Sequence, residues 1–130
     1  ANTFDLSELR IGQFELPISK TEWIDRGSSD ATILEQLRQS EHSFFPVFTK
    51  FPEEPVGVMS ARKALSRPST LWDDIMPPIK IDEEATLLQA LELFESSGAR
   101  LLFTQSGSMV TGILTIHDLM RALFGNLEAL

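Results

Sequence analysis

The apolar and polar positions of this 130-residue chain form two similar series, one after the other. Each series begins with a short extended piece, at residues 22–24 and again at residues 79–81. A helical pattern follows, and the first of these helices is predicted over residues 30–39, with Ser29 or Asp30 as its N-cap. In the second series the helix has apolar residues at spacings typical of one buried helix face. These residues are Leu87, Leu88, Leu91 and Phe94.

Two strands joined by a turn come next in each series, and a second helix closes it. The strands are predicted at residues 45–49, 56–59, 101–104 and 110–114. Proline, glycine and serine residues between the strands are typical of turns. The closing helices are predicted over residues 61–66, ended by Pro68, and over residues 116–124, ended by Gly125-Asn126.

The two series align at a nearly constant offset. Ile24-Asp25 recurs as Ile81-Asp82, at an offset of 57. After a turn whose length differs by two, Gly57-Val58-Met59-Ser60 corresponds to Gly112-Ile113-Leu114-Thr115, at an offset of 55. The order of elements and the apolar positions are kept together, which indicates an internal repeat.

One such repeat, of about 50 residues, is too small to bury a good core by itself. Two repeats related by pseudo-two-fold symmetry can pack their sheets and helices together, so we predict an α/β (α+β) fold with two packed β-α-β-β-α repeats. The predicted boundaries are residues 21–68 for repeat one, 69–78 for a linking helix and 79–127 for repeat two. Residues 1–20 lie outside the repeat and are too apolar for a free tail, so we expect this segment to pack on the module.

Composition and charge exclude several classes of protein. The chain has 42% hydrophobic and 23% charged residues, as expected of a folded domain. Its net charge of −8 argues against nucleic acid as a partner. No apolar run approaches the roughly 20 residues that span a bilayer, and cysteine is absent, which is compatible with a cytoplasmic location. Because the chain does not begin with Met, we expect it to be part of a longer protein.

The sequence predicts neither a metal site nor an enzyme. His42 and His117 are the only histidines and lack ligand-like spacing, whereas a zinc site needs about four ligands. The acidic clusters at residues 53–54, 73–74 and 82–84 lie in turns and helix starts, where acidic residues are favoured in any case. No Ser-His-Asp spacing or nucleophile elbow is present, so we predict no catalytic residues.

Residues 112–119 read GILTIHDL and contain Thr115-x-x-Asp118. A threonine at the N-cap with an acidic residue three positions later satisfies free backbone N–H groups at a helix start. On this motif alone, a helix cap is favoured over a ligand site.

A β-α-β-β-α unit that occurs twice and ends each time in Gly-apolar-apolar-[Ser/Thr] resembles the cystathionine β-synthase (CBS) domain pair, or Bateman module. The resemblance covers about residues 17–126. Among CBS pairs, the sequence is similar to those of the CorC/HlyC haemolysin-like, cyclin M-related family of magnesium and cobalt transport proteins. The stretches that carry this likeness are EWID, SEHSFFPVF and GVMSARKAL in the first copy, and IMPPIKID, LELFESSGARLLF and GILTIHDLMRALFG in the second.

This resemblance implies that an adenine nucleotide (ATP, ADP or AMP, with Mg²⁺ as a possible counter-ion) binds in clefts between the repeats without being chemically changed. The start of the helix after Thr115 would seat the phosphates, and Asp118 would accept both ribose hydroxyls. Gly112 would permit a close backbone approach. The resemblance also implies an apolar slot for adenine and an arginine near the phosphates, and these residues are Ile81, Leu101, Ile113 and Arg100.

The first copy departs from the family pattern. Ser60 keeps the hydroxyl, but the aspartate position holds Lys63, which cannot accept hydrogen bonds from ribose. The family's arginine before Phe-Pro-Val is Phe44 here. In the second copy, Gln105-Ser106-Gly107-Ser108 replaces the family's Asp-Glu-Tyr-Gly-Gly turn. The substitutions favour one intact site and one degenerate site, the latter with Gly57, Ser60 and Ile24.

Two functions remain open. The first is a nucleotide-sensing regulatory module, the cytosolic part of a CorC/HlyC-like protein with an attached membrane domain. The alternative is a structural dimerisation module whose sites are degenerate. We also expect a homodimer formed through the helices, since the final helix carries apolar residues on more than one side. These residues are Leu119, Met120, Leu123, Phe124 and Leu127.

Overall fold

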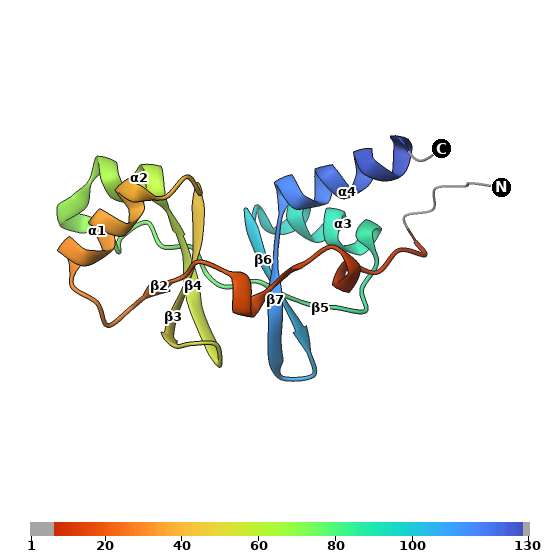
Figure 1. Cartoon of the computed structure of the whole chain (residues 1–130), viewed down its shortest axis with the longest axis horizontal. Helices are drawn as coiled ribbons and strands as arrows, with labels where there is room; N and C mark the ends of the chain where they lie inside the picture. The colour runs from red at the N-terminus through yellow and green to blue at the C-terminus, as the bar shows by residue number, and fades with distance from the viewer. Residues whose placement is uncertain (1–6, 129–130) are drawn as a thin grey trace. The chain divides into compact units, whose positions relative to one another are not determined.

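The computed structural model of the chain describes residues 7–128, with side chains up to Gly125 (Figure 1). It consists of two compact units. The first-repeat unit is Glu22–Pro78. The second-repeat unit combines the described residues up to Thr21 with those from Ile79 onward. Each unit is described by itself below.

The first-repeat unit is a three-stranded sheet with two α-helices. Strand β2 runs parallel to β3, and β3 runs antiparallel to β4, in the order β2-β3-β4. Helices α1 and α2 pack against each other on one side of this sheet (Figure 1). The elements are β2 (Ile24–Asp25), α1 (Asp30–Gln39), β3 (Phe44–Lys50), β4 (Glu54–Ser60), α2 (Ala61–Ser66) and the 3-10 helix η3 (Pro68–Thr70).

The second-repeat unit repeats this order and adds an N-terminal strand. Its sheet has the order β1-β7-β6-β5, with β5 parallel to β6 and the other neighbours antiparallel. The elements are η1 (Ile11–Gln13), β1 (Leu16–Pro17), η2 (Ile18–Lys20), β5 (Lys80–Asp82), α3 (Leu87–Ser97), β6 (Leu101–Ser106), β7 (Met109–Thr115) and α4 (Ile116–Glu128). The predicted β-α-β-β-α order is therefore confirmed in both repeats.

Side-chain caps fix where the helices begin. The Ser29 hydroxyl accepts a hydrogen bond from the Thr32 N–H (3.2 Å), which confirms Ser29 as the N-cap of α1. Thr86 and Gln89 form a reciprocal capping box at the start of α3. Gly98 ends α3 in the left-handed region, at φ 70°, which glycine adopts without steric cost.

Each unit buries its own apolar cluster between helices and sheet. In the first-repeat unit, Ile33 and Leu37 of α1 pack against Phe45 and Val47 of β3 and Met59 of β4. In the second-repeat unit the cluster joins the N-terminal segment, α3, the sheet and α4, and its most buried members are Ile11, Leu87, Ala90, Leu102, Leu114 and Leu119. Burying a side chain of this size contributes roughly 1.5–3 kcal/mol. The N-terminal segment is therefore part of a core.

The structure differs from the prediction at the linking segment and at the end of α4. In place of a linking helix over residues 69–78, the chain has the short helix η3 followed by turns. Met76 exchanges two backbone hydrogen bonds of 2.9 Å with Val58, which hold it extended, and a residue before proline is disfavoured in a helix. Helix α4 also continues through Gly125-Asn126 to Glu128. A glycine costs a helix only about 1 kcal/mol, which packing of Leu119 and Ala122 offsets.

A short extended segment lies against the hairpin of each unit at a glycine. In the second-repeat unit, β1 pairs with β7, with Leu16 opposite Ile113 and Pro17 opposite Gly112. A Cβ on Gly112 would collide with the Leu16 carbonyl oxygen and the Glu15 carboxylate. In the first-repeat unit, a Cβ on Gly57 would lie 2.7 Å from the Met76 carbonyl oxygen and from Ile75 Cγ1. Both glycines are needed because a backbone carbonyl occupies the space of a side chain.

We predict that Gly57→Ala and Gly112→Ala each lower the free energy of unfolding by about 1–3 kcal/mol, the usual cost of overpacking. Gly125→Ala is the matched control, since a Cβ at this position would have no heavy atom within 4 Å. It should raise the free energy of unfolding by up to about 1 kcal/mol through helix propensity. Urea denaturation measures all three, and a Gly112→Ala variant as stable as wild type would contradict the close contact.

Candidate functional site

Thr115 and Asp118 form a reciprocal cap at the start of α4. The Thr115 hydroxyl accepts a hydrogen bond from the Asp118 N–H (3.0 Å), and Asp118 Oδ2 accepts one from the Thr115 N–H (3.2 Å). Thr115 and Asp118 thus make the capping arrangement that their spacing predicted. The carboxylate also lies in the first turn, where the helix dipole favours a negative charge.

The second oxygen of Asp118 is paired with Arg121, a residue that the sequence pattern did not single out. Arg121 Nη2 donates to Asp118 Oδ1 at 2.5 Å. The Asp118 side chain is 18% exposed and the Arg121 side chain 69%. An exposed ion pair of this kind is worth about 0–1 kcal/mol. A ligand that needs the carboxylate could therefore displace Arg121 at little cost.

An open pocket of about 470 Å³ adjoins this carboxylate. It is lined by Asp118, Arg121, Ala122 and Gly125 of α4 and by Phe14 of the N-terminal segment. Phe14 was expected to pack as part of the apolar N-terminal segment, but its place beside Asp118 was not foreseen. A charged pair beside an apolar wall is the usual composition of a small-molecule pocket.

Two of the three apolar residues predicted to contact adenine lie on the same face of the sheet as Thr115. Leu101 is the cross-strand partner of Thr115, and Ile113 lies two residues before Thr115, so all three share one face of the sheet. Leu101 and Ile113 are buried, at 1% and 6% exposure. Ile81 packs instead against the helix-side core with Leu102 and Leu114, which lie on the opposite face. Ile81 is thus separated from the proposed slot.

The two remaining predicted residues of this site also have clear positions. Arg100 is exposed and directly precedes β6, one residue from the partner of Thr115. Gly112 is buried, and the backbone that approaches it in this structure is that of Leu16. Gly112 therefore serves the pairing of β1 with β7.

The corresponding positions in the first-repeat unit form a cap without a carboxylate. The Ser60 hydroxyl accepts a hydrogen bond from the Lys63 N–H (3.3 Å), and the Lys63 side chain is exposed. Gly57 is covered by Ile75 and Met76. Ile24 is fully buried in the core cluster, so it has no surface to offer a ligand.

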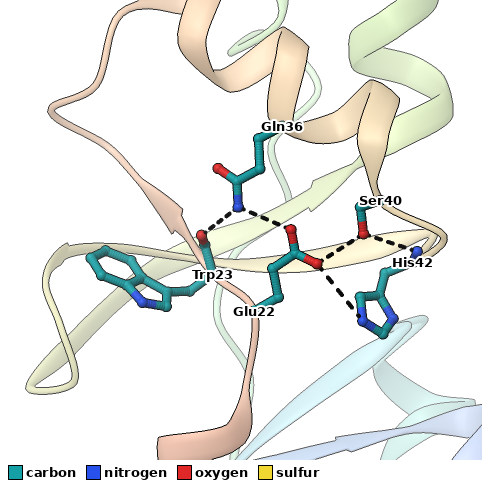
Figure 2. Close-up of polar contacts among 5 residues, drawn as sticks. All are labelled: Glu22, Trp23, Gln36, Ser40 and His42. Atoms are coloured by element: carbon teal, nitrogen blue, oxygen red, sulfur yellow. Dashed lines mark hydrogen bonds and ion pairs between the residues drawn. The ribbon is translucent and has the colours of Figure 1, made fainter.

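A polar cluster around Glu22 lies in the first-repeat unit (Figure 2). Glu22 accepts hydrogen bonds from Gln36 Nε2 (3.2 Å) and from the Ser40 hydroxyl (2.9 Å), and His42 Nε2 lies 3.8 Å from Glu22 Oε1. These contacts fix the loop that leads to Ser43, whose carbonyl accepts the Ala61 N–H at 2.9 Å. The cluster joins the segment before β2 to α1 and the loop after it, and the separate sequence positions gave no signal of it.

Among residues 7–128, no group of three or more His, Cys, Asp or Glu side chains is arranged to hold a metal ion. None of the helices described is long and apolar enough to cross a membrane.

Residues 72–125, which include Gly112, Thr115 and Asp118, match the CBS domain family. The chain is 21% identical to the magnesium and cobalt efflux protein CorC of Vibrio cholerae, over 95% of this chain and 45% of that protein. A CBS domain protein from Shewanella oneidensis has the same fold at a TM-score of 0.79 and 26% identity, over 87% of this chain and 95% of that one. The CBS domain of a bacterial CNNM/CorC family Mg²⁺ transporter, solved with ATP, matches at a TM-score of 0.83 and 18% identity, over 92% and 90%.

The chain therefore has the fold of a tandem CBS domain pair, and its second repeat matches the CBS domain family. It is similar to the CBS pairs of CorC-like transport proteins. The chain spans less than half the length of the curated relatives that it matches.

We predict that Thr115→Ala destabilises the chain by about 1 kcal/mol, because it removes the acceptor for the Asp118 N–H. Ser60→Ala removes the corresponding acceptor in the first repeat and should cost a similar amount. Thermal or urea denaturation measures both. If Thr115→Ala left stability unchanged while Ser60→Ala lowered it, the cap at α4 would not contribute to folding.

Proposed function

We propose that this chain is a regulatory module that binds an adenine nucleotide at the start of α4 and performs no chemistry on it. The observation that carries this proposal is the grouping of the Thr115 hydroxyl, the N-terminus of α4 and the Asp118 carboxylate, which also lines an open pocket. The ATP complex of the CNNM/CorC CBS domain supports the choice of ligand.

Each part of the nucleotide has a candidate partner. The N–H groups and positive end of α4 suit phosphate, with Thr115 facing it and Arg100 nearby. Asp118 can accept hydrogen bonds from both ribose hydroxyls once Arg121 moves aside. Leu101 and Ile113 supply apolar surface for adenine on the face that carries Thr115. Mg²⁺, where it is needed, would be held by the phosphates and water, as is usual for this ion.

We propose one nucleotide per chain. The first-repeat cap ends in Lys63 where the second has Asp118, and an ammonium group only donates hydrogen bonds. The ribose hydroxyls would then lack an acceptor there.

Nucleotide binding would regulate a larger protein. The regulation would operate through a coupling free energy between the nucleotide site and an attached domain. We propose that this domain is the membrane part of a CorC-like transport protein, with the CBS pair on its cytoplasmic side. The partial coverage of the curated relatives supports this placement.

One observation favours the alternative function, a dimerisation module without a ligand. Both oxygens of Asp118 already have partners within the chain, the Thr115 N–H and Arg121. A cap that satisfies itself in this way is stable without nucleotide.

Calorimetric titration with ATP, ADP and AMP, with and without Mg²⁺, separates the two functions. Asp118→Asn should weaken binding about tenfold or more, a loss of roughly 1.5–3 kcal/mol, because it removes a charged acceptor. Its effect on stability should not exceed about 1 kcal/mol. Lys63→Asp restores the missing acceptor and should add a second, weaker site. No heat with any adenine nucleotide at millimolar concentration, in wild type and Lys63→Asp alike, would leave the dimerisation module as the better account.

We further propose a homodimer formed through the helices. Phe124 on α4 is 60% exposed and Leu88 at the start of α3 is 38% exposed, which leaves apolar surface on both helices of one unit. Leu119 is fully buried in the core, and Met120 and Leu123 are half-buried, so Phe124 is the residue of the predicted set that offers surface. The side chain of Leu127 lies outside the described residues.

Light scattering at high micromolar concentration should give the mass of two chains, and Phe124→Asp should shift it to one. Met109→Asp is the matched control, because Met109 is 70% exposed at the β6–β7 turn, away from the helices. A strict monomer in the wild type would remove this proposal.

A further inference from the structure

Beside the equivalent glycines of the two hairpins, the first repeat has apolar side chains and the second has polar ones. The side chain beside Gly57 is Ile75, and the side chain beside Gly112 is Glu15; in both cases the next residue supplies the carbonyl that lies over the glycine. The cross-strand partners of the two glycines are Val47 and Thr104. The first repeat thus fills the position with an isoleucine and a valine, and the second with a glutamate and a threonine.

Glu15 is held by hydroxyl groups from two strands. Thr104 of β6 donates to Glu15 Oε2, and Thr111 of β7 donates to the same oxygen at 3.0 Å. The two hydroxyls are 3.2 Å apart, and Thr104 is completely buried. These bonds span 89 and 96 residues of sequence, so they tie the N-terminal segment to the hairpin.

A second carboxylate lies close to Glu15. Glu83 follows β5, and its carbonyl accepts the Gly12 N–H at 2.9 Å. A Cβ on Gly12 would lie 3.4 Å from Glu83 Cβ and 3.7 Å from Glu15 Oε1, so both acidic residues lie next to Gly12. Glu83 is the charged group that acts on Glu15, while β6 and β7 contribute threonine hydroxyls, which do not titrate. The negative charge of Glu83 disfavours the ionised form of Glu15.

Ile75 shows that docking at this position does not require a polar group. We propose that Glu15, Thr104, Thr111 and Glu83 form a proton-linked clasp that docks the N-terminal segment onto the second-repeat unit and loosens as the pH rises. This proposal does not rest on nucleotide binding.

The way in which docking of the N-terminal segment changes with pH follows from the titration of Glu15. Burial raises the pKa of Glu15 above its ordinary value of 4.5, Glu83 raises the pKa further, and the bonds from Thr104 and Thr111 oppose them. A raised pKa means that the docked segment holds the proton more tightly than the released one. Docking is therefore strongest below the ordinary pKa and weakens as the pH rises through the docked pKa. A difference of one unit corresponds to about a tenfold change in the docking equilibrium.

Nuclear magnetic resonance of the whole chain tests this clasp. The ¹³C shift of the Glu15 carboxyl gives its midpoint, and hydrogen exchange at Ile11 and Gly12 reports docking, because their N–H groups donate to Ala85 and Glu83. After correction for intrinsic exchange, protection of these two amides should fall through the Glu15 midpoint. The Met76 amide, docked beside Ile75 in the first repeat, is the internal reference and should show no such fall.

Three variants complete the test. Glu15→Gln should abolish the pH dependence at Ile11 and Gly12, whereas Glu84→Gln removes the same charge from an exposed neighbour and should keep it. Thr104→Val copies Val47 of the first repeat, removes a bond that lowers the pKa, and should move the Glu15 midpoint upward. The clasp is refuted if Glu15 titrates at or below its ordinary value, if wild-type protection does not change through its midpoint, or if Glu15→Gln retains the wild-type pH course.

Discussion

The contact between a backbone carbonyl and a glycine on the central hairpin is the constraint on which each repeat depends. At Gly112 the carbonyl belongs to Leu16, and at Gly57 it belongs to Met76. Absence of a side chain lets the extended segment lie directly on the hairpin strand and pair with it. In the second repeat this pairing sets the position of Phe14, and therefore one wall of the pocket at Asp118. The glycine of the family pattern thus acts through packing before it acts on any ligand.

The start of α4 is complete without a ligand. Thr115 and Asp118 satisfy each other's backbone, and Arg121 neutralises the carboxylate. A ligand must therefore exchange existing contacts for its own, so its net gain is smaller than the sum of its new bonds.

Local signals in the sequence were sufficient for most of the fold. The bounds of α1 and α2 agree with those predicted, because a side-chain cap at Ser29 and a proline at Pro68 mark them directly. The hairpin strands follow from apolar residues flanked by turn residues. Strand β1 escaped prediction because two residues carry no pattern, and its partner lies far away in sequence. The end of α4 escaped because packing outweighs the low helix propensity of Gly125.

The candidate site was predictable in part. The relation of Thr115 to Asp118 is local, and Leu101 and Ile113 follow from strand alternation once the hairpin is aligned. The separation of Ile81 depends on the pairing of β5, which alternation alone does not give. Arg121 and Glu15 act through side-chain contacts that no motif describes. Thr104 did leave a trace, since the aligned repeats have threonine in one copy where the other has Val47, but Glu15 lies outside the aligned repeats and its equivalence to Ile75 follows only from the structure.

The pairing of Leu16 with Ile113 also affects how the chain is made. Residues 22–78 form a continuous unit, so all of its internal contacts become available as soon as this stretch leaves the ribosome. The other unit is discontinuous, so its N-terminal segment is synthesised first and must wait, with Ile11 and Phe14 uncovered, until β7 emerges. Closing so long a loop is slow, and exposed apolar segments in a nascent chain are open to wrong pairings. During synthesis the N-terminal segment therefore exposes these apolar side chains until the second half of its unit has been made.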